Sequence, residues 1–387
     1  MRWTCSFLPF LLVGCVSGTS LEPGDLTVVA PRAPSAVVAF RDGDRDWVVA
    51  TGADSPLTFR VTSGEYTVAI GCPDIPGARG GHVDVYQMRL DDLASLPYDQ
   101  DCDASPPDAT LSGSVAGFPT DGNQSGFEVR WGVRSVFLVH DVDHYGFAAR
   151  AGRRDLIATR GAVVADRLLL IRDLPVLSDA TQPIDFASPA TIALVYQPIE
   201  GGQAGYLQNY FFSAGGTAVT LGAFQDSVLA VPASAMGEGD LQRVDIAGRR
   251  GPGYGQIFTT AHISRAPCTS IDLVGPVFEH PVVTGVLRGG VVDLHARWSP
   301  QADATLYDLY IGKWSVHASP AALEADGMTV PDLSGVPGWD DSFALPASST
   351  DWAMSVTTVA TLDDALRTLP VHEGEIRRSG WTGFVSP

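Results

Sequence analysis

The chain has 387 residues, 44 Asp and Glu against 25 Lys and Arg, and a formal net charge of −19 at pH 7. Such an acidic surface repels a phosphate backbone, which argues against nucleic acid as a partner. Lys313 is the one lysine, so Walker-type phosphate loops and most Schiff-base chemistry are excluded. The length indicates two to four domains, and 41 Gly and 27 Pro still leave enough apolar residues for packed cores.

An apolar stretch, residues 3–13, follows Arg2 at the N-terminus. Its length suits the core of a signal peptide and is too short to span a bilayer. The stretch ends in LVGC, residues 12–15, which resembles the lipobox of bacterial lipoproteins. The resemblance implies removal of residues 1–14 and lipid attachment at Cys15. Because Val16 is not Asp, it also implies sorting to the outer membrane.

Residues 15–25 contain Gly and Pro and little to bury, so we interpret them as a flexible tether. The alternative is ordinary secretion with cleavage near Gly18. Both interpretations export the chain. The lipoprotein interpretation predicts a protein of the cell envelope, facing the periplasm or the exterior and held at the membrane by lipid rather than by a spanning segment.

Export permits disulfide bonds, and Cys72 and Cys102 lie thirty positions apart in one predicted module. Closing that loop would stabilise the fold by roughly 3 to 4 kcal/mol on the chain-entropy model. Cys268 is then unpaired, and we expect it to be buried and inert. No Cys or His spacing suggests zinc, and no motif indicates a cofactor.

Alternation of apolar and polar residues is the dominant pattern in the rest of the chain, and it predicts strands. Residues 58–62 and 66–70 alternate on either side of Ser63-Gly64-Glu65 and predict a hairpin. Helices are expected to be few, with Ser319 to Gly327 the best candidate and residues 89–96 a second. Further strands are predicted at residues 134–140, 168–172, 191–197, 242–246 and 293–298.

The fold class that follows is all-β, with tandem β-sandwich domains after the signal peptide and tether. Short strands with turn residues every 8 to 12 positions are typical of sandwiches. Pro, Gly and Asp are densest near the expected boundaries. These divide the chain into modules at 26–104, 108–187, 188–265 and 266–387.

Three stretches resemble known β modules. Residues 36–72, continuing to Cys102, are similar to a recurrent extracellular module of secreted bacterial proteins, in which a DGDG-like turn precedes Trp47. LSGSVAGF and RRDLIATRG, in the second module, resemble carboxypeptidase-regulatory-like sandwiches. LHARWSPQADATLYDLYI, residues 294–311, resembles strands of a fibronectin type III domain. All three imply a sandwich and no catalytic residues.

His140, Asp143 and His144 form the most concentrated set of metal-ligating side chains. In an extended segment the two histidines point to one face and Asp141 and Asp143 to the other, so the ligands diverge. In a turn, Asp143 and His144 could both approach a metal. A strand end running into a polar turn is the alternative.

Two other features favour a structural interpretation. Asp42, Asp44 and Asp46 are spaced as in calcium loops, but Ala53 stands where an EF-hand needs Glu, so a hairpin turn explains them better. Trp339 lies in a turn-rich stretch with flanking carboxylates. It could stack on a sugar ring, or fold back as a lid on the core.

These observations predict a non-catalytic envelope lipoprotein with a binding or structural role. Its expected partners are a membrane, through the lipid, and a glycan or an envelope protein. A secreted metal-dependent hydrolase using His140, Asp143 and His144 is the rival hypothesis. A carbohydrate-binding surface protein using Trp339 is the third.

Overall fold

The computed structural model describes most of the chain, in segments separated by gaps. The described residues are 23–30, 35–73, 81–97, 108–117, 126–132, 134–139, 143–161, 165–201, 206–224, 226–250, 256–276, 278–288, 291–323, 327–339, 343, 350–367 and 369–385.

Almost every element in these segments is a strand, which confirms the all-β prediction. Helical structure in them is confined to α1 (Leu362–Leu366) and two 3₁₀ turns, Gly52–Asp54 and Ala233–Ala235. The described part of the chain contains no helix with the length and apolar character needed to cross a membrane.

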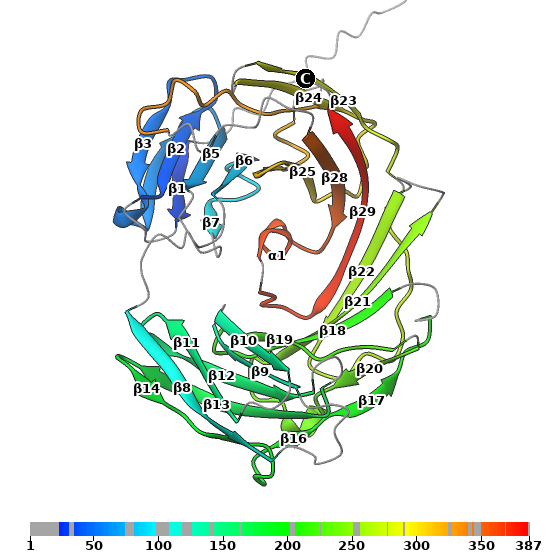
Figure 1. Ribbon diagram of the computed structural model, residues 1–387. Helices are drawn as coiled ribbons and strands as arrows, with labels where there is room; N and C mark the ends of the chain where they lie inside the picture. Colours follow the sequence, from blue (N-terminus) through cyan, green and yellow to red (C-terminus); the bar gives the residue numbers. More distant parts are fainter. Residues whose placement is uncertain are drawn as a thin grey trace, which may run out of the picture.

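Twelve of the described strands form one long sheet that curves round α1 (Figure 1). In spatial order they are β19 (Ala218–Thr220), β18 (Tyr206–Phe212), β21 (Leu241–Arg250), β22 (Gln256–Ser264), β29 (Gly374–Val385), β28 (Thr350–Thr358), β25 (Leu306–Ile311), β26 (Trp314–Ala318), β6 (His82–Arg89), β5 (Glu65–Cys72), β2 (Val37–Asp42) and β3 (Val48–Thr51).

Smaller sheets pack around the long one. They are β4 (Leu57–Val61), β1 (Gly24–Val29), β7 (Ser95–Pro97); β10 (Arg134–Val139), β9 (Gly126–Trp131), β12 (Gly152–Arg160), β13 (Arg167–Val176), β16 (Ile192–Ala193); β11 (His144–Ala149), β8 (Ala109–Ala116), β14 (Ala180–Thr181), with β15 (Ile184–Asp185) also on β8; β17 (Val195–Pro198), β20 (Ser227–Ala230); and β23 (Val282–Arg288), β24 (Val291–Arg297), β27 (Met328–Thr329).

The long sheet joins segments that the sequence assigns to different modules. β6 pairs in parallel with β26, placing Val85 opposite Val316. The strands of 26–104 and 266–387 therefore share one sheet and one core. The segment 108–187 differs, because a core cluster drawn from Ala109 to Phe186 lies between its own two sheets. The boundary positions themselves stay predictions.

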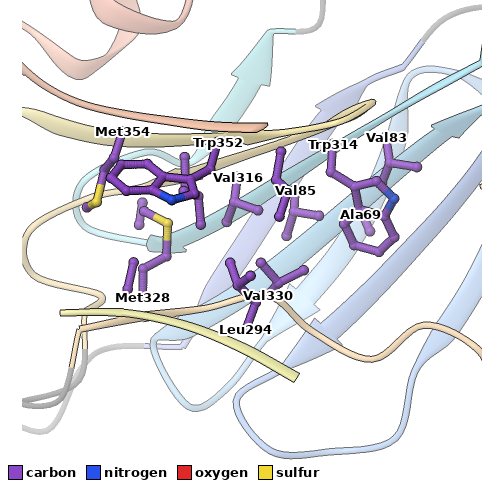
Figure 2. Packing of buried hydrophobic residues seen from close by; sticks show 14 of the residues in the cluster. Ala69, Val83, Val85, Leu294, Trp314, Val316, Met328, Val330, Trp352 and Met354 are labelled. Atoms are coloured by element: carbon purple, nitrogen blue, oxygen red, sulfur yellow. The ribbon is translucent and has the colours of Figure 1, made fainter. Parts of the chain in front are cut away.

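The main core lies between the long sheet and the β23-β24-β27 sheet. Figure 2 shows Val316, Trp352 and Met354 of the long sheet facing Leu294 and Val330. Leu294 and Ala296 are fully buried, as the alternation of residues 293–298 predicts. Burying such side chains stabilises the fold by about 1.5 to 3 kcal/mol each.

The other face of the long sheet changes character along its length. Over β2, β5 and β6 it is apolar, and the β4-β1-β7 sheet covers it through Leu26, Val28 and Leu96. Leu362 of α1 packs against the same cluster. Beyond β6, towards β26, β25 and β28, this face carries Asp84, His317 and Asp308 instead.

The hairpin predicted for residues 58–70 is wrong in its pairing. β4 pairs with β1, whereas β5 pairs with β2 and β6, so the chain changes sheets between them. Asp42 holds that change of direction. Its buried carboxylate accepts hydrogen bonds from the backbone N–H and the hydroxyl of both Thr62 and Ser63, at 2.6 to 3.1 Å.

The hairpin turn preferred for Asp42 to Asp46 is confirmed, because β2 and β3 pair antiparallel on either side of it. The two predicted helices are wrong. Residues 89–96 form a turn followed by β7, and residues 319–323 form a turn, with 324–326 outside the described residues. The Ser319 hydroxyl, expected to cap a helix, donates instead to Asp92 at 2.6 Å.

Candidate functional site

The metal-ligand set predicted from sequence is only partly described. Asp143 and His144 are exposed and bond to each other, with 3.2 Å between His144 Nδ1 and Asp143 Oδ1. That hydrogen bond lowers the pKa of Asp143. His140 lies outside the described residues, and no three potential ligands gather among those that are described. A metal site here stays a prediction.

Trp339 is half-buried and packs on the main core. Its ring lies 6.1 Å from that of Trp314 and 4.7 Å from that of Phe343, between centroids. This packing is the arrangement expected of a lid on the core. A contact between Trp339 and a glycan stays a prediction.

The cysteines are also partly described. Cys15 and Cys102 lie outside the described residues, so lipid attachment and the Cys72–Cys102 disulfide stay predictions. Cys72 is buried at the end of β5. Cys268 is a free, buried thiol, as expected, and burial raises its pKa.

The convergent polar residues of the described chain lie elsewhere, on the concave face of the long sheet. Strand alternation puts them there. On β25, Leu309 and Ile311 point into the main core, so Asp308 and Tyr310 point to the opposite face. Neighbouring strands follow the same rule, and Ser355, on β28, lies directly opposite Asp308.

His317 of β26 is the centre of this polar face. Its Nδ1 lies 2.7 Å from Asp308 Oδ1, and its Nε2 lies 3.8 Å from Asp84 Oδ1. The imidazole stacks on Tyr86 at 4.9 Å between ring centroids and meets the edge of Tyr310. His317 is 9% exposed and Asp308 only 1%.

This geometry makes His317 a cation. Burial by itself would lower its pKa, but the hydrogen bonds and charges of Asp308 and Asp84 prevail and raise it to about 9. Burial would likewise raise the pKa of Asp308, yet its hydrogen bond to His317 lowers it. Both ring nitrogens of His317 face carboxylates, so the imidazole is not poised to accept a proton from a ligand.

The connection between β28 and β29 crosses this face and carries α1. Leu362 at one end packs on the cluster beneath β1, and Leu369 at the other packs on Phe212 and Ile376. Two apolar anchors thus hold the connection above a polar floor. Thr361 caps α1 by accepting a hydrogen bond from the Asp364 backbone N–H.

The space between α1 and the sheet is a groove of about 270 Å³, which we call the α1 groove. Its lining residues are Tyr86, Arg243, Thr259, Ala261, Asp308, Tyr310, His317, Asp364, Ala365, Leu366, Arg367, Ile376 and Arg378. Neither Asp143 and His144 nor Trp339 reaches it.

A second hollow of about 340 Å³ continues the groove along the sheet. It shares Arg243 with the α1 groove and is lined by Tyr210 and Phe212 on one side and Leu369 on the other. A larger cavity of about 830 Å³ lies beside Arg41, but its wall passes from Leu323 to Gly327 through undescribed residues. The α1 groove is therefore the better-described candidate site.

Two side chains in the groove are suited to hold a ligand. Tyr310 is 38% exposed, and the charge of Asp308 together with burial raises its pKa, so its hydroxyl stays a donor. The Arg378 Nε donates to Thr357 Oγ1 at 3.0 Å, which holds the guanidinium over the groove. The arrangement offers an aromatic ring and several hydrogen-bonding groups to a polar molecule.

Sequence analysis missed this site because its members come from distant segments. Asp84, His317 and Asp308 are brought together by the β6-β26-β25 pairing. One local signal was available. Each is a charged or titratable residue inside a strand that is otherwise apolar.

No family model and no curated protein matches this chain. Among solved structures, it is similar to a presumed carbohydrate-binding protein from Bacteroides uniformis, with 10% identity and a TM-score of 0.16, covering 73% of this chain and 100% of that one. It is also similar to the open conformation of the pilus adhesin SpaC from Lactobacillus rhamnosus GG. That match has 9% identity and a TM-score of 0.14, covering 77% of this chain and 43% of the adhesin. Functional inference must therefore come from the groove itself.

Proposed function

We propose that this chain is a lipid-anchored protein of the bacterial envelope that binds a saccharide in the α1 groove, without catalysis. The proposal joins an anchor inferred from the N-terminal sequence to a site built from the structure. The anchor rests on the LVGC motif at residues 12–15 and on the short apolar segment before it.

The juxtaposition of Tyr310 and Arg378 in a groove lined by polar side chains carries the binding half of the proposal. A sugar ring has apolar C–H faces and a rim of hydroxyls. A tyrosine ring covers the faces, while guanidinium and carboxylate groups such as Asp364 bond the hydroxyls. Tyr310, Arg378 and Asp364 thus supply both kinds of contact.

The chemistry of the groove favours binding over hydrolysis. A general acid at neutral pH needs a carboxyl with a raised pKa, whereas the pKa values of Asp308 and Asp364 are both lowered. For Asp364, burial acts in the opposite direction, but hydrogen bonds with Thr361 and His372 prevail. These two lining carboxylates are thus held ionised, as acceptors of hydrogen bonds.

A glycan array probed with the wild-type protein and with Tyr310→Ala tests the proposal. The wild type should bind a defined set of glycans, and the variant should lose most of that signal. Tyr196→Ala is the matched control, because Tyr196 is an exposed tyrosine on β17. Loss of binding in the control alone, or no glycan signal with the wild type, would overturn the proposal.

A further inference from the structure

Arg378 differs from the arginines around it in having an unsatisfied guanidinium. Arg243 pairs with Asp245 at 2.7 Å, and Arg367 pairs with Asp363 at 2.7 Å. For Arg378, the described part of the chain provides one bond, from Nε to Thr357. Its two Nη groups have no hydrogen-bond or ion-pair partner among the described residues, and they line the α1 groove.

The charge of the groove is also unlike that of the whole protein. Three arginines and the His317 cation line it, against the carboxylates of Asp308 and Asp364. In a chain of net charge −19, this is a local excess of positive charge. Because the other groove cations have carboxylate partners, the excess is concentrated on Arg378.

We propose that the α1 groove selects saccharides bearing a carboxylate, such as a uronic acid, and that Arg378 is the residue that binds this carboxylate. The proposal rests on saccharide binding at the groove and names the class of sugar. A planar guanidinium donates two parallel hydrogen bonds to the two oxygens of one carboxylate. A single negative charge matches a single unpaired cation.

The second hollow extends the argument to a chain of sugars. It adjoins the α1 groove at Arg243 and presents Tyr210 and Phe212, which can lie against a further ring. A carboxylate held by Arg378 would therefore anchor one residue of an oligosaccharide whose neighbours continue along the sheet. Oligomers should bind better than the isolated acid.

The test is titration calorimetry of the full-length protein in detergent, with galacturonic acid oligomers as the ligand. Methyl-esterified oligomers of the same length keep the shape and remove the charge. The wild type should bind the acid form about tenfold or more tightly than the ester. Arg378→Gln should abolish that preference, and Arg378→Lys should restore it only in part, since lysine lacks the planar fork.

Arg377→Gln is the matched control, because Arg377 is the next residue of β29, lies on the opposite face and pairs with Glu375. It should bind like the wild type. Thermal unfolding of each variant shows that the fold is intact. Equal affinity of the wild type for acid and ester, or an undiminished preference in Arg378→Gln, would overturn the inference.

Two further outcomes separate this inference from the proposed function. If neutral glycans bind through Tyr310 and acidic ones have no advantage, the carboxylate inference fails and saccharide binding stands. If a sulfated oligosaccharide is bound through Arg378 and galacturonate is not, the anion is a sulfate ester and the carboxylate assignment is wrong. If Tyr310→Ala changes no glycan binding, the groove is not the site and both proposals fail.

Discussion

The Nδ1 atom of His317 lies 2.7 Å from Oδ1 of Asp308, and Asp84 approaches the opposite edge of the same imidazole. Three titratable groups from three strands thus form a buried ionic cluster beneath the α1 groove. Such a cluster costs desolvation free energy, which the mutual attraction and hydrogen bonds offset only while all members are present. The groove floor should therefore be sensitive to the charge of His317.

Stability should fall as the pH rises from about 6.5 to about 9. The pKa of His317 is 6.5 as a free side chain and about 9 in the fold. Its contribution is therefore complete below pH 6.5 and is lost as the pH passes through 9, a loss of about 3 kcal/mol. Urea unfolding across this range measures it. His317→Gln should be less stable at pH 6 and should lack this dependence; an equal slope in the variant would contradict the assignment.

Asp42→Ala should destabilise the protein by about 1 to 3 kcal/mol, because the backbone N–H groups of Thr62 and Ser63 lose their acceptor. Although burial opposes it, these bonds lower the pKa of Asp42 from 3.8 to about 2. The contribution is therefore present above pH 3.8 and is lost as the pH falls towards 2. Denaturant melts at pH 7 and pH 2.5 check both statements. Asp44→Ala, on the exposed turn, should change neither melt.

A non-reduced digest should yield the peptides of Cys72 and Cys102 joined by a disulfide. Cys102→Ser should then lower the free energy of unfolding by roughly 3 to 4 kcal/mol on the chain-entropy model. Cys268→Ser is the control, since Cys268 is a buried free thiol and its peptide should appear unlinked. Mass spectrometry showing both Cys72 and Cys102 as free thiols would refute the pairing.

Radiolabelled palmitate should enter the wild-type protein in a bacterial host and should not enter Cys15→Ser. The reason is that a lipobox directs acylation to the cysteine that becomes the new N-terminus. The variant should also leave the membrane fraction on cell fractionation. Equal labelling of both proteins would exclude Cys15 as the acylated residue, and Cys5→Ser, within the predicted signal peptide, serves as the control.

Local patterns predicted strands well and partners poorly. Alternation in residues 293–298 correctly assigns Leu294 and Ala296 to the core, because burial on one face leaves a direct trace in the sequence. The same pattern at residues 58–70 says nothing about which strands pair. Asp42, twenty residues upstream of Thr62, decides that β4 and β5 join different sheets.

The candidate site was beyond local patterns for the same reason. Asp308 and His317 are neighbours in sequence, and their pairing could be suspected from β25 and β26 alone. Asp84 and Arg378 reach them only through pairings of β6 and β29 with distant strands. Helix signals failed in a similar way, since the Ser319 hydroxyl that resembles a cap is used by Asp92.

The parallel contact between β6 and β26 also governs how the chain can be built. Translation produces β6 long before β26, so a nascent chain must wait for residues 314–318 before that edge is covered. Until then the backbone of β6 can recruit another strand, which is a route to aggregation. Any shortened version ending before Trp314 would retain this bare edge, so holdase chaperones should be needed most during that interval.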